Sequence, residues 1–177
     1  DTETSSLNPI EAEIVGISFC LGPNDAFYIP LAHKKIKSLK REYVLEKIKP
    51  ILEDASIKKI GQNIKYDFIV LKKYGIEVSP LEDTMLMSYV LDAGNNRHNM
   101  NILSEIHLGH KTIAYKDVVG SGKKQLNFSE VNLKEATEYA AEDADVTFRL
   151  YEHLSERVNS EKLNKIYEIF EKPMIKL

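Results

Sequence analysis

The sequence predicts a mixed α/β domain in which one sheet is flanked by helices, and three features of the residue pattern lead to this prediction. Residues 1–32 are rich in β-branched and aromatic residues, as strands are. From residue 41 onward the apolar residues recur mostly at helical spacing, with one short apolar run between them. Residues 132–177 are helical in pattern. Strands, then strand–helix alternation, then helices is an order typical of one sheet covered by helices.

The N-terminal part of the chain is expected to form an antiparallel meander of three strands. Residues 12–20 (AEIVGISFC) and 25–32 (DAFYIPLA) each favour a strand, and GPND at 22–25 supplies the turn between them. DTET at residues 1–4 has the pattern of the end of a strand, and we expect the upstream half of that strand to precede it. Consecutive strands joined by short turns pair antiparallel.

The middle of the chain is expected to alternate between helices and a short strand. Residues 41–54 have apolar residues at helical spacing, although Pro50 is expected to end or kink this helix. Residues 57–63 (IKKIGQN) indicate a short buried strand. Residues 64–75 then predict a helix that ends near Gly75.

The rest of the chain is expected to be helical. Two helices are predicted at residues 82–94 and 101–109, with the polar loop GNNRHN between them. The alanine-rich run 132–158 predicts a long helix with Asn132 as its N-cap. A last helix is expected from about residue 160 to the end, interrupted near Pro173.

Length, composition and charge restrict the class of protein before any motif is considered. A chain of 177 residues can bury one sizeable core, and it holds no apolar run of the ~18 residues that cross a bilayer. Its single cysteine, Cys20, cannot form an internal disulfide and fits a buried thiol in a reducing compartment. The net charge of −3 argues against a large phosphate-binding surface, but not against a small acidic site that holds metal ions.

Two acids open the chain, Asp1 and Glu3, in D-x-E spacing. Because side chains alternate along a strand, both carboxylates of such a pair point to the same face. Neighbouring carboxylates repel each other, so the pair is costly unless water or a cation surrounds it. Taken alone, the pair is more often explained by exposure to water than by a bound cation.

Two further motifs place a polar or aromatic side chain four residues before an acid. In GQNIKYD, Asn63 and Asp67 share one helical face; the alternative is a simple helix cap followed by an exposed acid. In YAAEDADVT, Tyr139 and Asp143 repeat this spacing, and the two alanines between them let another element approach. A phenol beside a carboxylate can orient a water, whereas the alternative is an aromatic core residue next to an exposed acidic turn.

The three acid motifs together are more informative than each alone. Hard oxygen donors from a strand end and two helices suit a pair of Mg²⁺ or Mn²⁺ ions. Two such ions, about 4 Å apart, activate a water and stabilise the leaving oxygen in phosphodiester cleavage. The sequence has no Cys/His cluster of the kind that indicates zinc. The neighbouring acids Glu142 and Asp145 are expected to be exposed and outside the site.

In their order along the chain, DTETSSL, GQNIKYD and YAAEDADVT resemble the three exonuclease motifs of the DEDD superfamily, and the tyrosine in the third motif is that of the DEDDy type. The chain is most similar to the 3′–5′ proofreading exonuclease domain of family A DNA polymerases, of the bacterial DNA polymerase I (Klenow) type. The similarity continues through YIPLAH, DTMLMSYVLDAGNNRHNM, HKTIAYKDVVGSGKKQLNF and AEDADVTFRLYEHL, so it covers nearly the whole chain. It implies a ribonuclease H-like fold with a central mixed sheet flanked by helices.

The resemblance implies catalytic roles for the four acids and the tyrosine of these motifs. Asp1, Glu3 and Asp143 would hold the first of two divalent metal ions, Mg²⁺ or alternatively Mn²⁺. Asp1 would also bridge to the second ion, which Asp67 would help to hold through water. Tyr139, with Glu3, would orient the attacking water. The expected products are deoxynucleoside 5′-monophosphates released from the 3′ end.

The resemblance also implies contacts with the DNA strand. Leu7 would act as an apolar wedge between the last two bases. Tyr115, where the bacterial member of the family has a phenylalanine, would contact the terminal base or sugar, as aromatic rings in single-strand sites do. Gln62, Asn63 and Arg97 would contact the sugar–phosphate backbone. The alternatives are a strand-end core residue for Leu7 and a solvated loop charge for Arg97.

The resemblance further implies that residues 1–177 are one exonuclease domain of a larger polymerase, with the polymerase domain following Leu177. Its partners would be a single-stranded 3′ end of DNA and that polymerase domain, at the site of DNA replication and not in a membrane. Lysine (20) far outnumbers arginine (4), which indicates an AT-rich genome, in a bacterium or an organelle of bacterial descent such as an apicoplast. The enzymatic alternative is an RNase D-like exoribonuclease, and the non-enzymatic one is a scaffold or single-strand clamp.

Overall fold

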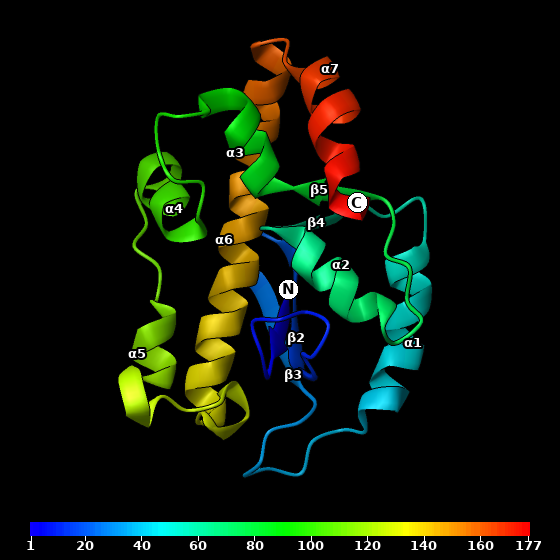
Figure 1. Ribbon diagram of the computed structural model, residues 1–177, viewed down its shortest axis with the longest axis vertical. Helices are drawn as coiled ribbons and strands as arrows, with labels where there is room; N and C mark the ends of the chain where they lie inside the picture. Colours follow the sequence, from blue (N-terminus) through cyan, green and yellow to red (C-terminus); the bar gives the residue numbers. More distant parts are fainter.

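A computed structural model describes the backbone of residues 1–177 and all side chains except that of Lys123 (Figure 1). The strands are β1 (Thr2–Thr4), β2 (Ile14–Gly22), β3 (Asp25–Pro30), β4 (Lys59–Gly61) and β5 (Leu81–Asp83). The α-helices are α1 (Arg41–Glu53), α2 (Ile64–Lys72), α3 (Thr84–Asp92), α4 (Met100–Leu108), α5 (Tyr115–Val119), α6 (Leu133–Ser160) and α7 (Asn164–Ile166). Short 3₁₀ turns span Gly122–Lys124 and Phe128–Glu130, and α7 continues into a π-helical turn, Tyr167–Glu171, and a 3₁₀ turn, Lys172–Lys176.

The first three strands form the expected antiparallel meander, in the order β1-β2-β3. Thr2 of β1 lies opposite Ile17 of β2, which in turn lies opposite Ile29 of β3. The pairing continues to the first residue, because the amino group of Asp1 donates to the Ser18 carbonyl (3.1 Å) and the Ser18 N–H donates to the Asp1 carbonyl (3.0 Å). The register of the sheet therefore fixes the position of Asp1 and Glu3.

The fold belongs to the expected mixed α/β class, but the strands hydrogen-bond in two sheets rather than one. β4 and β5 pair parallel in a second, two-stranded sheet. A cavity of about 330 Å³ lies between β2 and β4, and residues of α2 and α6 complete its walls. Residues of both sheets line this cavity, and the central sheet expected from the sequence is divided into two hydrogen-bonded parts.

Three local predictions differ from the structure. The pattern favours a helix from residue 82, whereas 81–83 form β5 and α3 begins only at Thr84. α5 was not predicted, since a helix of five residues is too short to show a period. α1 continues through Pro50 to Glu53, because a proline so near the C-terminal end removes a single intrahelical bond.

The long helix α6 passes beside the three-stranded sheet, as Figure 1 shows. It packs against β2 and β3 of this sheet and against the helices α3 and α4. Its N-cap is the predicted residue: the Asn132 side chain accepts a hydrogen bond from the Lys134 N–H (2.9 Å). The first half buries alanines at helical spacing, Ala136, Ala140 and Ala144. Small side chains let this half lie close to the strands, whereas the second half packs larger residues against α3 and α4.

The chain ends in a helical segment that is separate from α6. α6 ends at Ser160 and a turn at Lys162, which has left-handed backbone (φ 60°), separates it from α7. From α7 to Lys176 the backbone remains helical, with Tyr167 and Ile175 buried. Among the described residues, no helix is both long and apolar enough to cross a membrane.

Candidate active site

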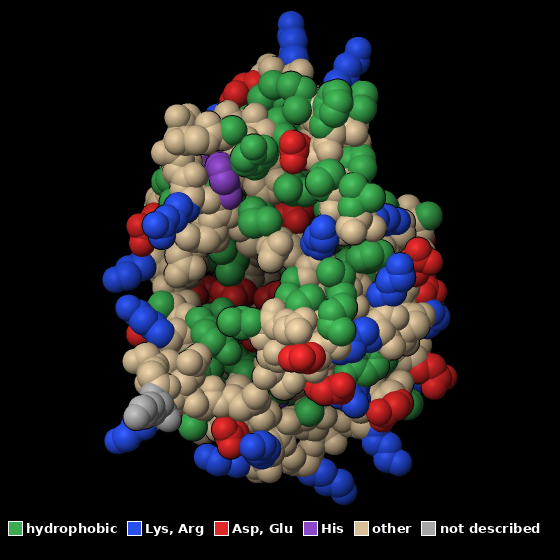
Figure 2. All heavy atoms as spheres, viewed as in Figure 1, with side chains coloured by type: hydrophobic (Ala, Val, Ile, Leu, Met, Phe, Trp, Pro, Cys, Tyr) green, Lys and Arg blue, Asp and Glu red, His purple; other side chains and the backbone are tan. Residues whose placement is uncertain are grey.

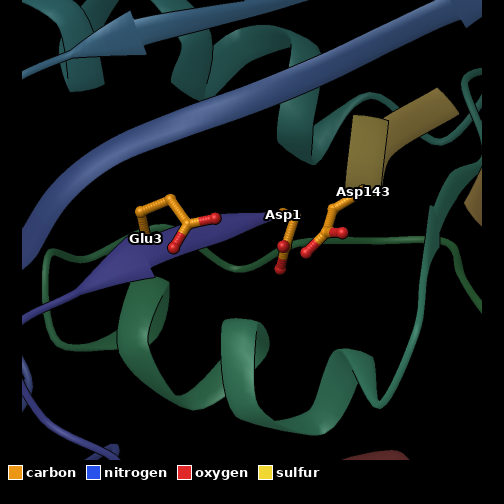
Figure 3. Close-up of side chains that lie close together, drawn as sticks. All are labelled: Asp1, Glu3 and Asp143. Atoms are coloured by element: carbon orange, nitrogen blue, oxygen red, sulfur yellow. The ribbon is translucent and has the colours of Figure 1, made fainter. Parts of the chain in front are cut away.

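Three of the predicted acids meet at one place. The carboxylate oxygens of Asp1, Glu3 and Asp143 lie within 4.8 Å of one another. Figure 3 shows Asp1 between the other two, with Asp1 and Glu3 coming from the first strand and Asp143 from α6. Figure 2 shows acidic side chains at the bottom of a hollow with hydrophobic side chains on its rim, where α6 passes the chain's amino terminus. The acids are therefore accessible through an opening, although two of them are buried.

The local sequence explains how the three carboxylates come together. Asp1 and Glu3 are two residues apart in extended chain, so they point to the same face of the sheet. Asp143 reaches them from α6, whose buried Ala140 and Ala144 lie close by in the same helix. Of the two alanines between Tyr139 and Asp143, Ala140 is fully buried, as expected where another element comes close, whereas Ala141 is half-buried.

Asp67, the fourth acid, lies beside this group and holds the strand that carries it. Its Oδ1 accepts hydrogen bonds from the Thr2 N–H (2.8 Å) and the Thr2 hydroxyl (2.5 Å). Asp67 is buried, so the alternative of an exposed acid is wrong. Because Thr2 stands between Asp1 and Glu3, this contact ties α2 directly to the acidic pair.

The electrostatics of the site favour a bound cation. Burial, together with the nearby Asp143 carboxylate, raises the pKa of Glu3 to about 8. Burial raises the pKa of Asp143 to about 7, and that of Asp67 is also raised by burial. The Oδ1 atom of Asp143 is buried without a hydrogen-bond partner among the described residues. A divalent ion would neutralise these charges and satisfy that oxygen, and an all-carboxylate donor set suits Mg²⁺ or Mn²⁺.

Tyr139 lies one turn before Asp143 and belongs to an aromatic cluster beside the acids. A hydrogen bond from Tyr139 works against burial and lowers the pKa of Asp143, and burial raises the pKa of the Tyr139 phenol itself. The Tyr139 ring lies 5.9 Å from that of Tyr115 and 6.0 Å from that of Phe128. Tyr115 is 39% exposed and stacks parallel on Phe128, with ring centroids 6.3 Å apart. The cluster thus presents one aromatic face next to the carboxylates.

Gln62 and Asn63 form a turn that Asp83 holds in place. The Gln62 amide is bonded at both ends, to the Thr84 hydroxyl (2.5 Å) and the His98 carbonyl (2.7 Å). Asn63 stands at the N-cap position of α2 in left-handed conformation (φ 57°) and its side chain makes no capping bond. Asp83 caps α2 instead, accepting from the N–H groups of Asn63 (3.1 Å) and Ile64 (3.0 Å).

The two remaining predicted DNA contacts lie in exposed loops. Arg97 is exposed in the loop between α3 and α4, next to His98, whose carbonyl the Gln62 amide contacts. Leu7 is 92% exposed, so the alternative of a core residue is wrong. The ends of the Leu7 loop are joined, because the Ser5 N–H donates to the Glu13 carbonyl (3.0 Å) and the Glu13 N–H donates to the Ser5 hydroxyl (3.0 Å).

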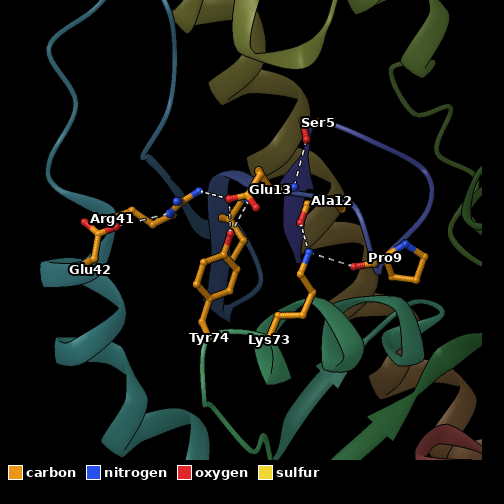
Figure 4. A network of polar contacts seen from close by, with 9 residues as sticks. Ser5, Pro9, Ala12, Glu13, Arg41, Glu42, Lys73 and Tyr74 are labelled. Carbon is orange, nitrogen blue, oxygen red and sulfur yellow. Dashed lines mark hydrogen bonds and ion pairs between the residues drawn. The ribbon is translucent and has the colours of Figure 1, made fainter.

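A polar network holds the base of the Leu7 loop against α1 and α2 (Figure 4). The Glu13 carboxylate accepts from Arg41 (2.6 Å) and from the Tyr74 hydroxyl (2.8 Å). The ammonium group of Lys73 donates to the Ala12 carbonyl (2.6 Å). The network fixes the two ends of the loop and leaves its apolar tip in solvent.

The structure adds residues that the sequence analysis missed. Thr2 and Asp83 position the acids and the Gln62–Asn63 turn, and Phe128 supports Tyr115. Glu142 was predicted to be exposed, and this is wrong: its carboxylate accepts from His110 (2.8 Å) and from the Ile113 N–H (2.6 Å). These contacts join residues far apart in the chain, so no local sequence pattern indicates them. The exception is Asp83, because an acid directly before a helical pattern is a typical N-cap.

Asp145 was also predicted to be exposed, and this prediction is wrong as well. Its side chain is half-buried and accepts a hydrogen bond from the Asn24 N–H (2.6 Å) in the turn between β2 and β3. Asp145 and Glu142 thus tie α6 to its surroundings on either side of Asp143.

Solved structures share this fold, and one of them is described as the apo form of a nuclease (TM-score 0.71, 20% sequence identity, over 92% of this chain and 72% of that one). NrnC of Brucella melitensis superimposes with a TM-score of 0.74 over 99% of this chain and 78% of its own, at 23% sequence identity. A further structure of that protein, with bound Mg²⁺, gives a TM-score of 0.73. The chain therefore shares the ribonuclease H-like fold of these proteins.

Comparison of sequences identifies the family to which this chain belongs. A family model described as 3′–5′ exonuclease matches residues 1–159. DNA polymerase I of Rhizobium leguminosarum is 44% identical over 99% of this chain, and that of Pseudomonas aeruginosa is 41% identical over 99%. The chain belongs to the 3′–5′ exonuclease domains of DNA polymerase I. It spans 19% and 20% of the length of these two relatives.

Proposed function

We propose that this chain hydrolyses phosphodiester bonds at the 3′ end of single-stranded or frayed DNA and releases deoxynucleoside 5′-monophosphates, as the proofreading part of a DNA polymerase. The observation that carries the proposal is the group formed by Asp1, Glu3 and Asp143, with one oxygen of Asp143 buried and unpartnered. Membership of the 3′–5′ exonuclease family supports the same reaction.

The acids would hold two divalent ions, Mg²⁺ or Mn²⁺. Asp1, Glu3 and Asp143 would hold one of them, and Asp1 with Asp67 the other, the latter through water. Bound ions of this kind supply an activated water and stabilise the leaving oxygen. The contribution of the protein is to hold the carboxylates together against their repulsion. The backbone of Asp1 is fixed by two hydrogen bonds to Ser18, so the ligands do not need to be assembled when the ions bind.

Tyr139 and the aromatic cluster would position the reacting nucleotide. The Tyr139 phenol stays protonated because burial raises its pKa, so its hydroxyl can donate or accept a hydrogen bond at the attacking water, together with Glu3. Tyr115, held by Phe128, offers an exposed aromatic face to the terminal base or sugar. Leu7 offers an apolar tip that would separate the last two bases.

The turn of Gln62 and Asn63 and the loop of Arg97 would contact the sugar–phosphate backbone. Because both ends of the Gln62 side chain are already bonded within the protein, its contribution would be to fix the turn, together with any contact that it makes to the strand. Asn63 and Arg97 are exposed and free to reach a phosphate or sugar.

We further propose that the polymerase domain of the natural chain follows Leu177. The relatives that match this chain are DNA polymerases I about five times its length, since it covers 19% and 20% of them. The domain would then act at the site of DNA replication, and the relatives named here come from bacteria. A natural protein that ended near Leu177 would contradict this placement.

The test is digestion of a 5′-labelled single-stranded DNA, with RNA of the same sequence in parallel, in Mg²⁺, Mn²⁺ or EDTA. We expect a metal-dependent ladder that shortens from the 3′ end and is stronger on DNA. Stronger cleavage of RNA would favour an exoribonuclease, and no cleavage with either metal would contradict the proposal.

The site assignment has its own test in the double variant Asp1→Asn, Glu3→Gln. Neutral amides cannot replace charged metal ligands, so cleavage should be abolished while the circular dichroism spectrum is unchanged. The matched control is Glu46→Gln, which changes an exposed acid on α1 outside the site and should cleave like the parent. A double variant that degraded DNA at the parental rate would refute the assignment.

A further inference from the structure

An aromatic residue that has no role so far, Tyr89, lies on α3 close to the proposed contacts with the DNA strand. It is 47% exposed. α3 begins at Thr84, whose hydroxyl donates to the Gln62 side chain, and Tyr89 lies less than two helical turns further along α3. Figures 1 and 2 share one view and place α3 above the hollow that holds acidic side chains. The ring is therefore near the site without belonging to the acidic group.

The Tyr89 ring is held in place by His98, in the loop after α3. The two rings meet edge to face, with centroids 5.6 Å apart and planes at 82°. His98 is itself fixed at two points. Its Nδ1 is hydrogen-bonded to the hydroxyl of the buried Ser88 (2.9 Å), and its carbonyl accepts from the Gln62 amide (2.7 Å). These contacts keep the exposed ring in one orientation and join it to the Gln62–Asn63 turn.

Tyr89 and Arg97 together supply the two kinds of group that hold a single strand. An aromatic ring stacks on any base, and a cation contacts the phosphates. Arg97 is exposed and directly precedes His98, so the cation and the aromatic ring are carried by one connected structure. Leu7 and Tyr115 are proposed to contact the last two bases. A base that reaches Tyr89 therefore belongs to a nucleotide further from the 3′ end.

We propose that Tyr89, held by His98, is the stacking surface for the base of the third or fourth nucleotide from the 3′ end of a single DNA strand. Stacking on a ring accepts any base, as a site that edits any sequence requires. The contact lies away from the reacting phosphodiester, so it contributes to binding of the strand and not to the chemical step. The proposal rests on the proposed function, because the proposed strand contacts define the path of the strand.

The test measures binding of a short 5′-fluorescein-labelled oligothymidylate by fluorescence anisotropy, with Ca²⁺ in place of Mg²⁺. Tyr89→Ala should raise Kd at least about fivefold, which is the lower limit for the loss of one stacked base. Tyr89→Phe keeps the ring and should bind like the parent. The matched control is Tyr43→Ala, which removes an exposed tyrosine on α1 and should leave Kd unchanged.

A second series of strands identifies the base that stacks on Tyr89. Each strand lacks one base, at a single nucleotide from the first to the fifth from the 3′ end. In the parent, loss of the base at the third or fourth nucleotide should raise Kd about as much as Tyr89→Ala does. In Tyr89→Ala the same loss should have no further effect, whereas losses at the other nucleotides should act alike in both proteins. This coupling distinguishes stacking from a general effect of the substitution on the fold.

Three outcomes would overturn the proposal. A parental Kd in Tyr89→Ala, or an effect of each missing base that is the same in both proteins, would remove Tyr89 from the path of the strand. Coupling at the first or second nucleotide would assign the ring to the terminal bases instead. The DNA digestion assay is independent of these measurements. Cleavage without coupling refutes only the stacking surface, whereas coupling without cleavage refutes only the proposed exonuclease reaction.

Discussion

Glu3 is a residue at which the folded chain strongly opposes a negative charge. Its carboxylate is buried beside Asp143, and its pKa of about 8 stands well above the ordinary value of 4.5. A proton or a cation must therefore accompany this carboxylate in the folded state. The metal-binding function and the stability of the domain are consequently coupled at the same atoms.

This coupling predicts a pH dependence for the metal-free protein. A group whose folded pKa is raised stabilises the fold below its unfolded pKa and loses that contribution as pH rises through the folded value. For Glu3 the loss lies between about pH 4.5 and pH 8, so the melting temperature should fall as pH rises through this range.

Divalent ions should reverse this trend, because they compete with protons for the same oxygens. The rise in melting temperature on adding Mn²⁺ should grow from pH 6 to pH 8.5, as measured by differential scanning fluorimetry. In Glu3→Gln both the fall with pH and the growth of the metal effect should be smaller. A metal effect that was independent of pH would contradict the site.

Tyr139 should matter for rate more than for binding. Tyr139→Phe keeps the ring and its packing against Tyr115 and Phe128 but removes the hydroxyl beside Asp143. We expect kcat to fall about tenfold to a hundredfold, without complete loss, and KM for a single strand to stay within about twofold. Single-turnover digestion measures both. The control is the exposed Tyr43→Phe, and a parental rate in Tyr139→Phe would remove Tyr139 from the reaction.

At the scale of elements, the sequence predicts those features that a local pattern carries. The meander follows from β-branched runs with a turn between them, and α6 from a long alanine-rich period with an asparagine cap. β5 and α5 were missed because three and five residues do not show a period. The division of the strands into two sheets could not be predicted, since the register between strands depends on contacts far apart in sequence.

The residues of the candidate site, too, could be predicted from the sequence only where a local pattern indicates them. Asp1 and Glu3 share a face because of strand alternation, and Asp143 was found because its motif has a fixed spacing from Tyr139. The supporting contacts, such as that of Asp67 with Thr2, join residues 65 positions apart and leave no local trace. Their discovery required the fold.

Asp83 is the clearest of these supporting residues at the element scale. Its carboxylate accepts N–H groups at the start of two helices, Ile64 in α2 and Met85 in α3. Asp83→Ala should lower the free energy of unfolding by about 1–3 kcal/mol, because buried helix-end donors lose their acceptor. Urea unfolding measures this loss.

The same variant should also weaken cleavage, because α2 carries Asp67 and begins at the Asn63 turn. We expect KM and kcat to change together. Asp83→Asn keeps an acceptor oxygen and should recover part of the loss, and Glu105→Ala, at an exposed position of α4, is the control. Parental stability in Asp83→Ala would show that the cap is dispensable.

At the scale of the whole molecule, the charge distribution predicts weak and local binding of DNA. The net charge is −3, and acidic side chains lie at the bottom of a hollow. Each phosphate neutralised by the protein contributes about −0.7 to the slope of log affinity against log salt for a single strand.

We therefore expect the isolated chain to show a shallow slope, of about −1 to −2, in fluorescence anisotropy with a labelled single strand and Ca²⁺ in place of Mg²⁺. Arg97→Gln should reduce the slope by about one phosphate equivalent. A slope as steep as that of a duplex-binding protein would show that the chain neutralises many phosphates, and would contradict a site that contacts only the last few nucleotides.

The place of Asp83 has a consequence for heredity. A chain with Asp83→Ala retains every carboxylate of the acidic group and the whole aromatic cluster, so inspection of its motifs would report an intact site. If this domain edits newly copied DNA as proposed, the defect would appear as uncorrected copying errors that accumulate from one generation to the next. Counting new mutations in a lineage that carries the variant would expose a fault hidden in a helix cap.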